Sequence, residues 1–515
     1  MKDLLRNSMM KSPRLAMIGG LAGAMLFAIS SCQPTGAPPE QPAQQTQSPQ
    51  APQRFDGITI RILTFDGPIG STVASHAQAF EDQTGATVEI ETVPFGEIYS
   101  ATLQDLAKET PGYDAVFFVS QWLADYAAPG YLLDLSEWVN TDTALQWDDV
   151  APFYRNFAAT YQERIYGIPV DGDYHMVYYR TDLLEAAGLD VPKTWEDYLA
   201  IAQQFHGQDF TGDGQADYGS CIAKQPDHAG HWMFGSIAAA YLQSGGTAQG
   251  AFFDPNTMEP LVNNAAFAKA LEIYKQTNAY GPPDEQTYEV GQIMDMTVLQ
   301  NCALTIFWGD IAPLAVGSET QLKDTVGTVM LPGSKEVLDR ETGDLVACDK
   351  FTCPHAIDGI NHAPYAANIG WSGGINAKTS PEVAAASYAF ISYISQPERS
   401  NIDVAQGGSG FNPYRISHFA DREVWIEAGM SPEVASRYLG AISASLNSLN
   451  MVLDLTIPQA GRYQQEVLDD ALTAFLRDEI SRDEAIAQIE QGWNAITDEI
   501  GREQQLQAYR NSLGL

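Results

Sequence analysis

The stretch DFTGDGQADYGSC, residues 209–221, spaces its oxygen-bearing side chains as a calcium-binding loop does. Gly214 stands at the sixth position, where such loops turn sharply, but Ser220 occupies the twelfth, where a bidentate glutamate is usual. We therefore expect a structural calcium site rather than a helix–loop–helix sensor, and a bare acidic turn is the alternative. The residues that would hold the ion are Asp209, Thr211, Asp213, Gln215 and Asp217.

Two further patterns raise the question of an enzyme. GWSGG, residues 370–374, matches G-x-S-x-G, but that motif needs a helix to begin at the serine, and the next predicted helix begins only at Ser380. HAGH (228–231) and CPH (353–355) could supply metal ligands, yet H-E-x-x-H and a second close ligand pair are missing. The first β–α turn, TFDGPIGS, carries neither a P-loop nor a dinucleotide fingerprint. A secreted metal-dependent enzyme stays as one alternative.

The N-terminus has the features of an export signal. Four basic residues precede a mostly apolar run of residues 15–29, which is short for a membrane span and suits a signal peptide. The run ends in AISSC, which resembles the lipobox of bacterial lipoproteins. We expect a signal peptide over 1–31, lipidation of Cys32, and a Pro- and Gln-rich tether over 32–54.

Four cysteines follow Cys32, and an even number in an exported chain favours two disulfides among three connectivities. Cys348 and Cys353 are close together in a turn-like stretch, so we expect the pairs Cys348–Cys353 and Cys221–Cys302. The formal net charge of −37 argues against a nucleic-acid partner, because phosphate binding needs a basic face.

The mature chain alternates strand and helix patterns from residue 55. ITIRIL, ATVEIETV and YDAVFFV read as strands separated by helices near 72–83 and 97–108, which favours an open α/β sheet. CALTIFW and TVGTVMLP read as further strands. Thr194 with Asp197, and Ser481 with Glu484, predict capped helices, and Ser380 with Pro381 predicts another.

The stretch 166–205, YGIPVDGDYHMVYYRTDLLEAAGLDVPKTWEDYLAIAQQF, resembles family 1 of the extracellular solute-binding proteins. These are carbohydrate-binding subunits of ABC importers. The segments NCALTIFWGDIAPL, GWSGGINAKTSPEVAAASYAFISYISQPE and SRDEAIAQIEQGWNAI are similar to the family in the expected order. The resemblance implies a two-lobed α/β periplasmic-binding-protein fold with the ligand in a cleft between the lobes.

By that resemblance the N-lobe comprises 55–170 and 333–410, and the C-lobe comprises 171–332 and 411–515. The crossings would fall near Val170–Asp171, Pro332 and Phe411–Asn412. Trp308 and Trp371 match family positions beside glycine turns. A sugar needs paired polar groups for its hydroxyls and aromatic rings for its C–H faces. The expected ligand-binding residues are Phe65, Asp66, Gln121, Trp122, Asp171, Asp173, His175, Trp232, Trp308, Asp310, Trp371 and Tyr414.

The sequence thus predicts a monomeric, non-enzymatic substrate-binding subunit that captures a carbohydrate by lobe closure and delivers it to membrane permease subunits. It would be held by its lipid on the outer face of the cell membrane and would need no cofactor beyond a structural calcium. A polyol or compatible solute is the alternative ligand. Few of the candidates are Arg or Lys, which disfavours an anion.

Overall fold

The computed structural model describes residues 53–226, 229–318 and 320–515, and these described residues belong to one compact unit. The predicted signal peptide, the lipidation site Cys32 and nearly all of the tether lie outside the described residues. In the described ranges, no helix combines the length and the hydrophobicity that a membrane crossing requires.

The first sheet has five strands in the order β2-β1-β3-β14-β6. β1 lies between β2 and β3 and is parallel to both, as the alternating strand and helix patterns predict, whereas β14 is antiparallel to β3 and β6. Ile60 and Ile62 of β1 are fully buried on one face. The strands are β1 (Thr59–Phe65), β2 (Thr87–Val93), β3 (Ala115–Val119), β6 (Ile168–Pro169) and β14 (Trp371–Ile375).

The second sheet has four strands in the order β10-β7-β9-β8, with β8 and β9 parallel and the other pairs antiparallel. Its strands are β7 (Met176–Arg180), β8 (Tyr218–Cys221), β9 (Cys302–Phe307) and β10 (Val326–Met330). Three small pairs are β4 (Thr160–Tyr161) with β5 (Arg164–Ile165), β11 (Glu336–Leu338) with β12 (Leu345–Ala347), and β13 (Tyr365–Ala366) with β15 (Val452–Leu453). We call the elements around the first sheet the first lobe, and those around the second sheet the second lobe.

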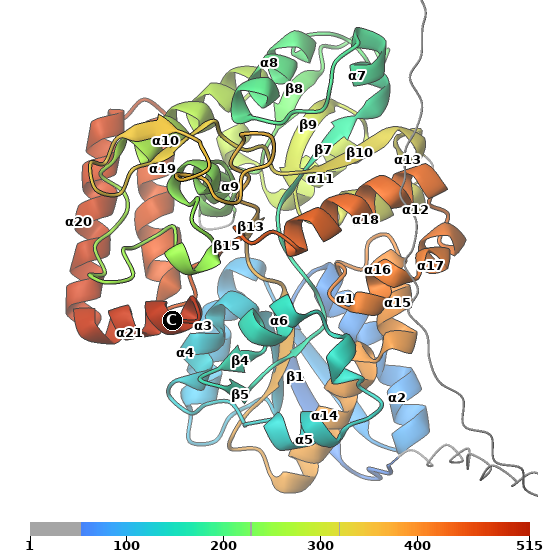
Figure 1. Cartoon of the computed structure of the whole chain (residues 1–515). Helices are drawn as coiled ribbons and strands as arrows, with labels where there is room; N and C mark the ends of the chain where they lie inside the picture. Colours follow the sequence, from blue (N-terminus) through green and yellow to red (C-terminus); the bar gives the residue numbers. More distant parts are fainter. Residues whose placement is uncertain (1–52, 227–228, 319) are drawn as a thin grey trace, which may run out of the picture. The chain divides into compact units, whose positions relative to one another are not determined.

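Helices surround both sheets (Figure 1). Those before residue 300 are α1 (Pro68–Ser75), α2 (Ala77–Thr84), α3 (Phe95–Ala107), α4 (Leu123–Ala127), α5 (Ser136–Thr141), α6 (Pro152–Phe157), α7 (Thr181–Ala187), α8 (Trp195–Phe205), α9 (Gly230–Leu242), α10 (Ala265–Thr277) and α11 (Val290–Val298). Those after it are α12 (Ile311–Gly317), α13 (Leu322–Thr325), α14 (Pro381–Ser395), α15 (Pro397–Ala405), α16 (Ile416–Ala420), α17 (Arg422–Glu427), α18 (Pro432–Leu446), α19 (Asp469–Leu476), α20 (Arg482–Ile500) and α21 (Arg502–Ser512).

The predicted caps form. Thr194 and Asp197 make a capping box at the start of α8, and Ser481 and Glu484 make another at the start of α20. The single helix expected near 72–83 is divided instead into α1 and α2. Its division follows from a tight turn, since the His76 N–H bonds back to Val73 O (3.3 Å).

The structure corrects one expected lobe boundary at residue 333. Residues 333–366 pack on the second lobe, not on the first. The Arg340 guanidinium donates to Leu242 O (3.1 Å), and the Asn361 amide donates to Ala240 O (2.7 Å), both at the end of α9. The chain therefore passes toward the first sheet at residues 367–370, between β13 and β14, rather than near Pro332.

The expected boundary at residue 411 also differs. The Ala151 N–H donates to Tyr414 O (2.9 Å), and the buried Arg415 guanidinium donates to Leu145 O (3.0 Å), which fixes this segment to the first lobe. The second lobe resumes with α18, where the Tyr438 hydroxyl donates to Gly309 O (2.8 Å). The crossing therefore lies between α17 and α18, because long-range hydrogen bonds decide which lobe each segment joins.

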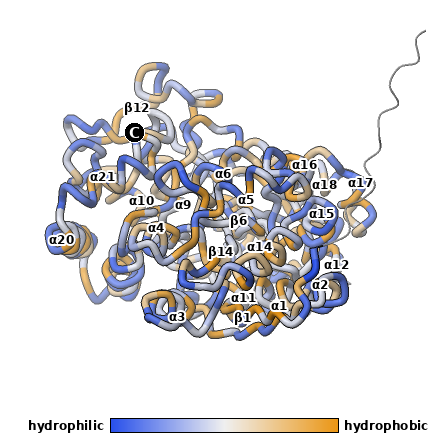
Figure 2. The backbone as a smooth tube through the Cα atoms, turned by 90° about the horizontal axis from the view of Figure 1, so that it is seen from below, coloured by the Kyte–Doolittle hydropathy of each residue, from blue (hydrophilic) through white to orange (hydrophobic). Residues whose placement is uncertain are grey.

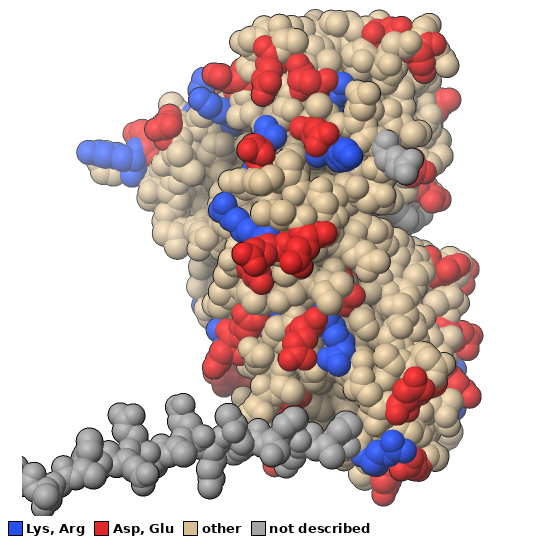
Figure 3. Space-filling model, turned by 90° about the vertical axis from the view of Figure 1, so that its right-hand side faces the viewer, with Lys and Arg blue, Asp and Glu red and all other residues tan. Residues whose placement is uncertain are grey.

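Apolar residues concentrate around the buried strands, while outer helices such as α20 are of mixed polarity along their length (Figure 2). Buried apolar residues form a core cluster that includes members of both sheets. The face in Figure 3 carries many acidic and fewer basic side chains, in keeping with the net charge of −37. Acid spread in this way favours a well-solvated surface.

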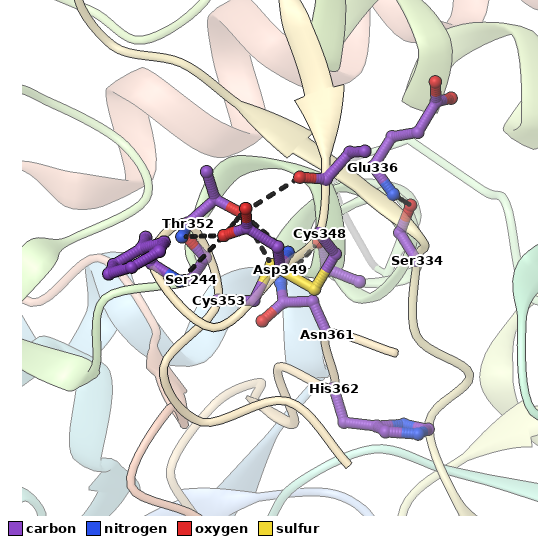
Figure 4. The surroundings of a disulfide bond; sticks show 12 residues. Ser244, Ser334, Glu336, Cys348, Asp349, Thr352, Cys353, Asn361 and His362 are labelled. Carbon is purple, nitrogen blue, oxygen red and sulfur yellow. Dashed lines mark hydrogen bonds between the residues drawn. A yellow bond between two sulfur atoms is a disulfide. The ribbon is translucent and has the colours of Figure 1, made fainter. Parts of the chain in front are cut away.

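Both predicted disulfides are present. Cys221 and Cys302 join the neighbouring strands β8 and β9, with their Cα atoms 5.8 Å apart. Cys348 and Cys353 close a turn in which the Asp349 carboxylate accepts the N–H groups of Phe351 (2.7 Å) and Thr352 (3.0 Å) (Figure 4).

The two disulfides close loops of very different length, with sequence separations of 81 and 5 residues. Replacing both Cys221 and Cys302 with Ala should therefore lower the free energy of unfolding by about 4 kcal/mol, and replacing both Cys348 and Cys353 by about 2 kcal/mol. Chemical denaturation of the two double variants tests the order. A larger loss at the 348–353 turn would contradict it.

Candidate functional site

Aromatic rings from both lobes form one continuous group, which we call the ring cluster. In the first lobe, Phe65 at the end of β1 stacks on Trp371 at the start of β14, with centroids 4.7 Å apart and planes at 26°. Phe95, at the start of α3, packs edge-to-face with both rings, and its centroid lies 5.8 Å from that of Phe65 and 6.3 Å from that of Trp371. Strand ends thus bring together residues that are 306 positions apart.

Phe95 also connects the first lobe to the second. Its centroid is 6.4 Å from Trp122 of the first lobe and 6.4 Å from Trp232 on α9 of the second. Trp232 lies 5.7 Å from Trp308, and Trp308 lies 4.3 Å from His175. The ring cluster therefore contains every ring expected from the sequence except Tyr414.

The polar edges of two indoles in the ring cluster are held by the protein. The Trp308 N–H donates to Ala367 O (3.2 Å), and the Trp232 N–H donates to Asp454 Oδ2 (2.7 Å). Rings fixed by their edges keep defined orientations. Their faces suit the C–H surfaces of a polyhydroxylated ligand.

Asp454, which follows β15 and is 3% exposed, was not among the sequence candidates. Its carboxylate accepts five hydrogen bonds. Besides the Trp232 indole, the donors are the Tyr365 hydroxyl (2.6 Å), the Asn368 N–H (2.8 Å), the Leu455 N–H (2.8 Å) and the Gln464 amide (2.8 Å). Sequence reasoning missed this residue because MVLDLT reads as an ordinary strand end.

The crossing into β14 has unusual backbone geometry. Asn368, Ile369 and Gly370 all have positive φ, at 73°, 65° and 97°. A β-branched residue such as Ile369 rarely adopts this conformation, and it persists only where the surroundings hold it. The bond from the Asn368 N–H to Asp454 is one such restraint, three residues before Trp371.

His175 offers a polar atom beside the ring cluster. Its Nδ1 is 2.6 Å from Ser236 Oγ, and that hydroxyl donates its hydrogen to Trp232 O (3.1 Å), so Nδ1 must be the donor. Burial, with a smaller contribution from His231, lowers the pKa of His175 to about 3. The imidazole is therefore neutral, and its Nε2 is a buried acceptor to which no described group hydrogen-bonds.

Three expected carboxylates gather at the first crossing rather than at the ring cluster. Asp171 Oδ1 accepts the Asn412 N–H (2.6 Å), and Asp173 Oδ1 accepts the Asn412 amide (2.9 Å). Burial raises the pKa of Asp171 to about 7 and of Asp310 to about 6. Burial and the neighbouring Asp171 and Asp310 charges raise the pKa of Asp173 well above its ordinary value. These groups link the crossing to Asn412.

The remaining candidates lie elsewhere. Gln121 is buried, but its amide donates to Gln464 and to Leu455 O (3.4 Å). Asp66 is exposed after β1. Tyr414 is buried in the first lobe, with its hydroxyl 3.0 Å from Ser395 Oγ.

The enzyme patterns do not acquire the geometry that their motifs require. Ser372 lies within β14, is fully buried and hydrogen-bonds to Ser120 Oγ (3.1 Å), so it is not at a strand-to-helix elbow. Cys353 is in a disulfide, and His231 Nδ1 pairs with Asp469 (2.9 Å). His228 lies outside the described residues.

The acidic loop is closed by its own hydrogen bonds. Asp209 accepts the N–H groups of Gly212 (2.7 Å) and Gly214 (2.9 Å), and Asp213 accepts that of Gln215 (2.8 Å). The buried Asp217 accepts the Thr211 hydroxyl (3.0 Å). Within the ranges described, no three His, Cys, Asp or Glu side chains are grouped to hold a metal. Calcium at this loop stays a prediction.

Comparison with known proteins agrees with the architecture. A family model described as bacterial extracellular solute-binding protein matches residues 66–398. A structure of an ABC transporter solute-binding protein from Agrobacterium radiobacter in complex with ribitol covers 86% of this chain and 100% of its own, with a TM-score of 0.69 at 22% identity. Maltose-bound MalE3 of T. maritima covers 85% and 100%, with a TM-score of 0.67 at 19% identity. The predicted two-lobed α/β fold is confirmed.

Two curated relatives are also similar. A probable amino-acid ABC transporter periplasmic-binding protein of Sinorhizobium fredii is 22% identical over 409 residues, 78% of this chain and 82% of the relative. A mannitol-binding protein of Pseudomonas aeruginosa is 26% identical over 244 residues, 46% of this chain and 51% of the relative.

The buried carboxylates predict a pH dependence of stability. Because the folded-state pKa values of Asp171, Asp173 and Asp310 are raised, the folded protein binds more protons than the unfolded chain between about pH 4 and pH 7. Their contribution to stability is therefore greatest at low pH and falls as pH rises through this window. Asp173→Asn, which cannot take part in this proton uptake, should therefore lose less free energy of unfolding than the wild type across this window.

Denaturant titrations at pH 4, 5.5 and 7 measure this difference. Asp358→Asn, at an exposed position, is the matched control and should follow the wild type. An Asp173→Asn profile parallel to that of the wild type would contradict the prediction.

Proposed function

The chain belongs to the bacterial extracellular solute-binding protein family, and from that premise we propose that it binds a carbohydrate or polyol between its two lobes for an ABC importer. The observation that carries the proposal is the ring cluster, which joins rings of both lobes through Phe95 and Trp232. A ligand held there contacts both lobes at once. Its binding therefore favours the closed arrangement, because that arrangement offers more contacts.

The chemistry of the ring cluster supports a neutral, hydroxyl-rich ligand. Its rings cover C–H faces, and His175 Nε2, as a neutral acceptor, takes a hydrogen bond from a ligand hydroxyl. No ring or polar group named at the cluster is a Lys or Arg, so a carboxylate or phosphate would meet no opposite charge there. This favours sugars and polyols over amino acids, although one relative is named as a probable amino-acid binder.

Isothermal titration with ribitol, mannitol, maltose and a panel of amino acids tests the proposal, and native mass spectrometry reports whether the solute is returned unchanged. We expect saturable binding of at least one sugar or polyol. Binding restricted to amino acids, or turnover of the solute, would contradict it.

Trp371→Ala should weaken binding of that solute by about tenfold or more, because it removes a ring face from the cluster. Trp371→Phe keeps a smaller ring, so its affinity for the solute should lie between those of Trp371→Ala and the wild type. Tyr414→Phe is the control, since this residue lies in the first-lobe core and should leave the affinity within about twofold. Equal affinities for Trp371→Ala and the wild type would remove the ring cluster as the binding site.

We further propose that the protein works outside the cytoplasm as a lipid-anchored monomer and hands its ligand to membrane permease subunits. Membership of an extracellular family supports export, and the AISSC stretch supports acylation at Cys32. The tether over 32–54 would give the lobes reach from the membrane.

Cell fractionation tests the anchor. The wild type should sediment with membranes, whereas Cys32→Ser should be recovered in the soluble exported fraction, because a serine cannot take the thioether-linked lipid. Equal distributions of the two proteins would contradict the anchor.

A further inference from the structure

A relay of hydrogen bonds leads from the ring cluster of the second lobe to the first lobe. The Trp232 indole donates to Asp454 Oδ2 (2.7 Å), and Asp454 Oδ1 accepts the Gln464 amide (2.8 Å). The oxygen of that same Gln464 amide accepts the Gln121 amide. Gln121 directly precedes Trp122, which lies at the opposite end of the ring cluster. We call Trp232, Asp454, Gln464 and Gln121 the relay.

Every member of the relay is buried. Trp232 is 1% exposed, Asp454 3%, Gln464 0% and Gln121 3%. Gln464 belongs to a π-helical segment, Arg462–Leu468, a wide turn that is rare and frequently found at functional sites. Hydrogen bonds between buried groups are costly to leave unmade, so a shift of one member is transmitted to the next.

Asp454 also restrains the other wall of the ring cluster. Through the Asn368 N–H (2.8 Å) it holds the strained crossing that leads directly into Trp371. One carboxylate thus sets the positions of Trp232 in the second lobe and of the segment before Trp371 in the first. Its other donors are Tyr365, in β13, and Leu455, the residue that follows Asp454 in the chain. These two hydrogen bonds keep the carboxylate itself in place.

A second contact between the lobes lies beside the relay. The Gln459 N–H, in the turn before the π-helical segment, donates to Asp125 Oδ1 (2.8 Å) on α4. The Tyr99 hydroxyl of α3 donates to the other carboxylate oxygen (2.9 Å). The turn, through Gln459, and the π-helical segment, through Gln464, therefore both contact the first lobe. This argues that the lobes contact each other through protein groups in this region.

We propose that Asp454 and Gln464 are positioning residues for the ligand site, which couple the orientation of Trp232 to lobe closure through Gln121. When the lobes close, Gln121 reaches Gln464, and Gln464 in turn holds Asp454 and the Trp232 indole in the geometry that binds the ligand. The inference rests on the proposed solute-binding function and adds to it a protein-to-protein contribution to closure. Gln121, expected from the sequence to touch the ligand, acts instead through Gln464.

Asp454→Asn would leave five donors facing a group with a single acceptor oxygen and is expected to destabilise the fold, so the test uses Gln121→Ala, Gln464→Ala and the double variant. Gln83→Ala is the matched control, since this glutamine donates to Tyr393 (3.2 Å) within the first lobe. Each protein is titrated with the sugar or polyol that the wild type binds best, and its release rate is measured by stopped flow.

Gln121→Ala and Gln464→Ala should each raise Kd by about tenfold, mainly through faster release, and the double variant should be no weaker than the weaker single variant. Gln83→Ala should match the wild type. Unchanged Kd values in either single variant, or losses that multiply in the double variant, would overturn the relay.

The orientation of Trp232 gives a second readout that needs no ligand. The emission of Trp232 is isolated by subtracting the spectrum of the corresponding Trp232→Phe protein in each background. Gln464→Ala should shift this component to longer wavelength, and Gln83→Ala should not. If the wild type binds no solute in the panel, the proposed function fails, while an unshifted component in Gln464→Ala overturns the relay in either case.

Discussion

The carboxylate of Asp454 is the constraint on which the rest of the site depends. A carboxylate group with 3% exposure is tolerable only if hydrogen bonds replace its lost hydration, and five donors do so here. These donors come from α9, β13, the crossing before β14, the backbone beside it and the π-helical segment. Satisfying one buried carboxylate therefore fixes the mutual arrangement of five parts of the chain that lie between residues 232 and 464.

The ring cluster follows from this arrangement together with the ends of the first-sheet strands. β1 and β14 deliver Phe65 and Trp371 to the same edge of the sheet, and α9 delivers Trp232 to face them. The crossing beside Asn412 is instead dominated by buried polar groups. There Asp171, Asp173 and Asp310 are buried together, and the raised pKa values reflect the cost of ionising closely spaced carboxylates away from water. The ring cluster is held together by apolar contacts, while the crossing is held by polar groups.

Much of the fold could be predicted because its signals are local. The side chains of the capping residues Thr194 and Ser481 each accept a backbone N–H only three residues along the chain. The alternation of Ile60 and Ile62 is visible within one strand. The pairing of Cys221 with Cys302 followed from the short spacing of the other two cysteines. The site was only partly predictable. Trp308 and Trp371 were candidates through the family resemblance and lie in the ring cluster. Asp454 and Gln464 have hydrogen-bond partners up to 343 positions away, and no local pattern reveals them.

The same limit explains why the lobe boundaries differ from those expected and why the candidate residues do not all lie together. The family resemblance implied crossings near Pro332 and Phe411, but the hydrogen bonds of Arg340 and Arg415 assign these segments to the second and the first lobe, respectively. Residue types in the 209–221 loop predict calcium ligands, and this stays a prediction, because the direction of each side chain depends on turn geometry that composition does not specify.

A crystal structure of the protein with its tightest-binding sugar or polyol tests the central claim most directly. The account predicts a ligand whose C–H faces lie against rings of the cluster formed by Phe65, Phe95, Trp122, Trp232, Trp308 and Trp371, with one hydroxyl donating to His175 Nε2. A ligand bound away from these rings, with no contact to the ring cluster in either lobe, would contradict it.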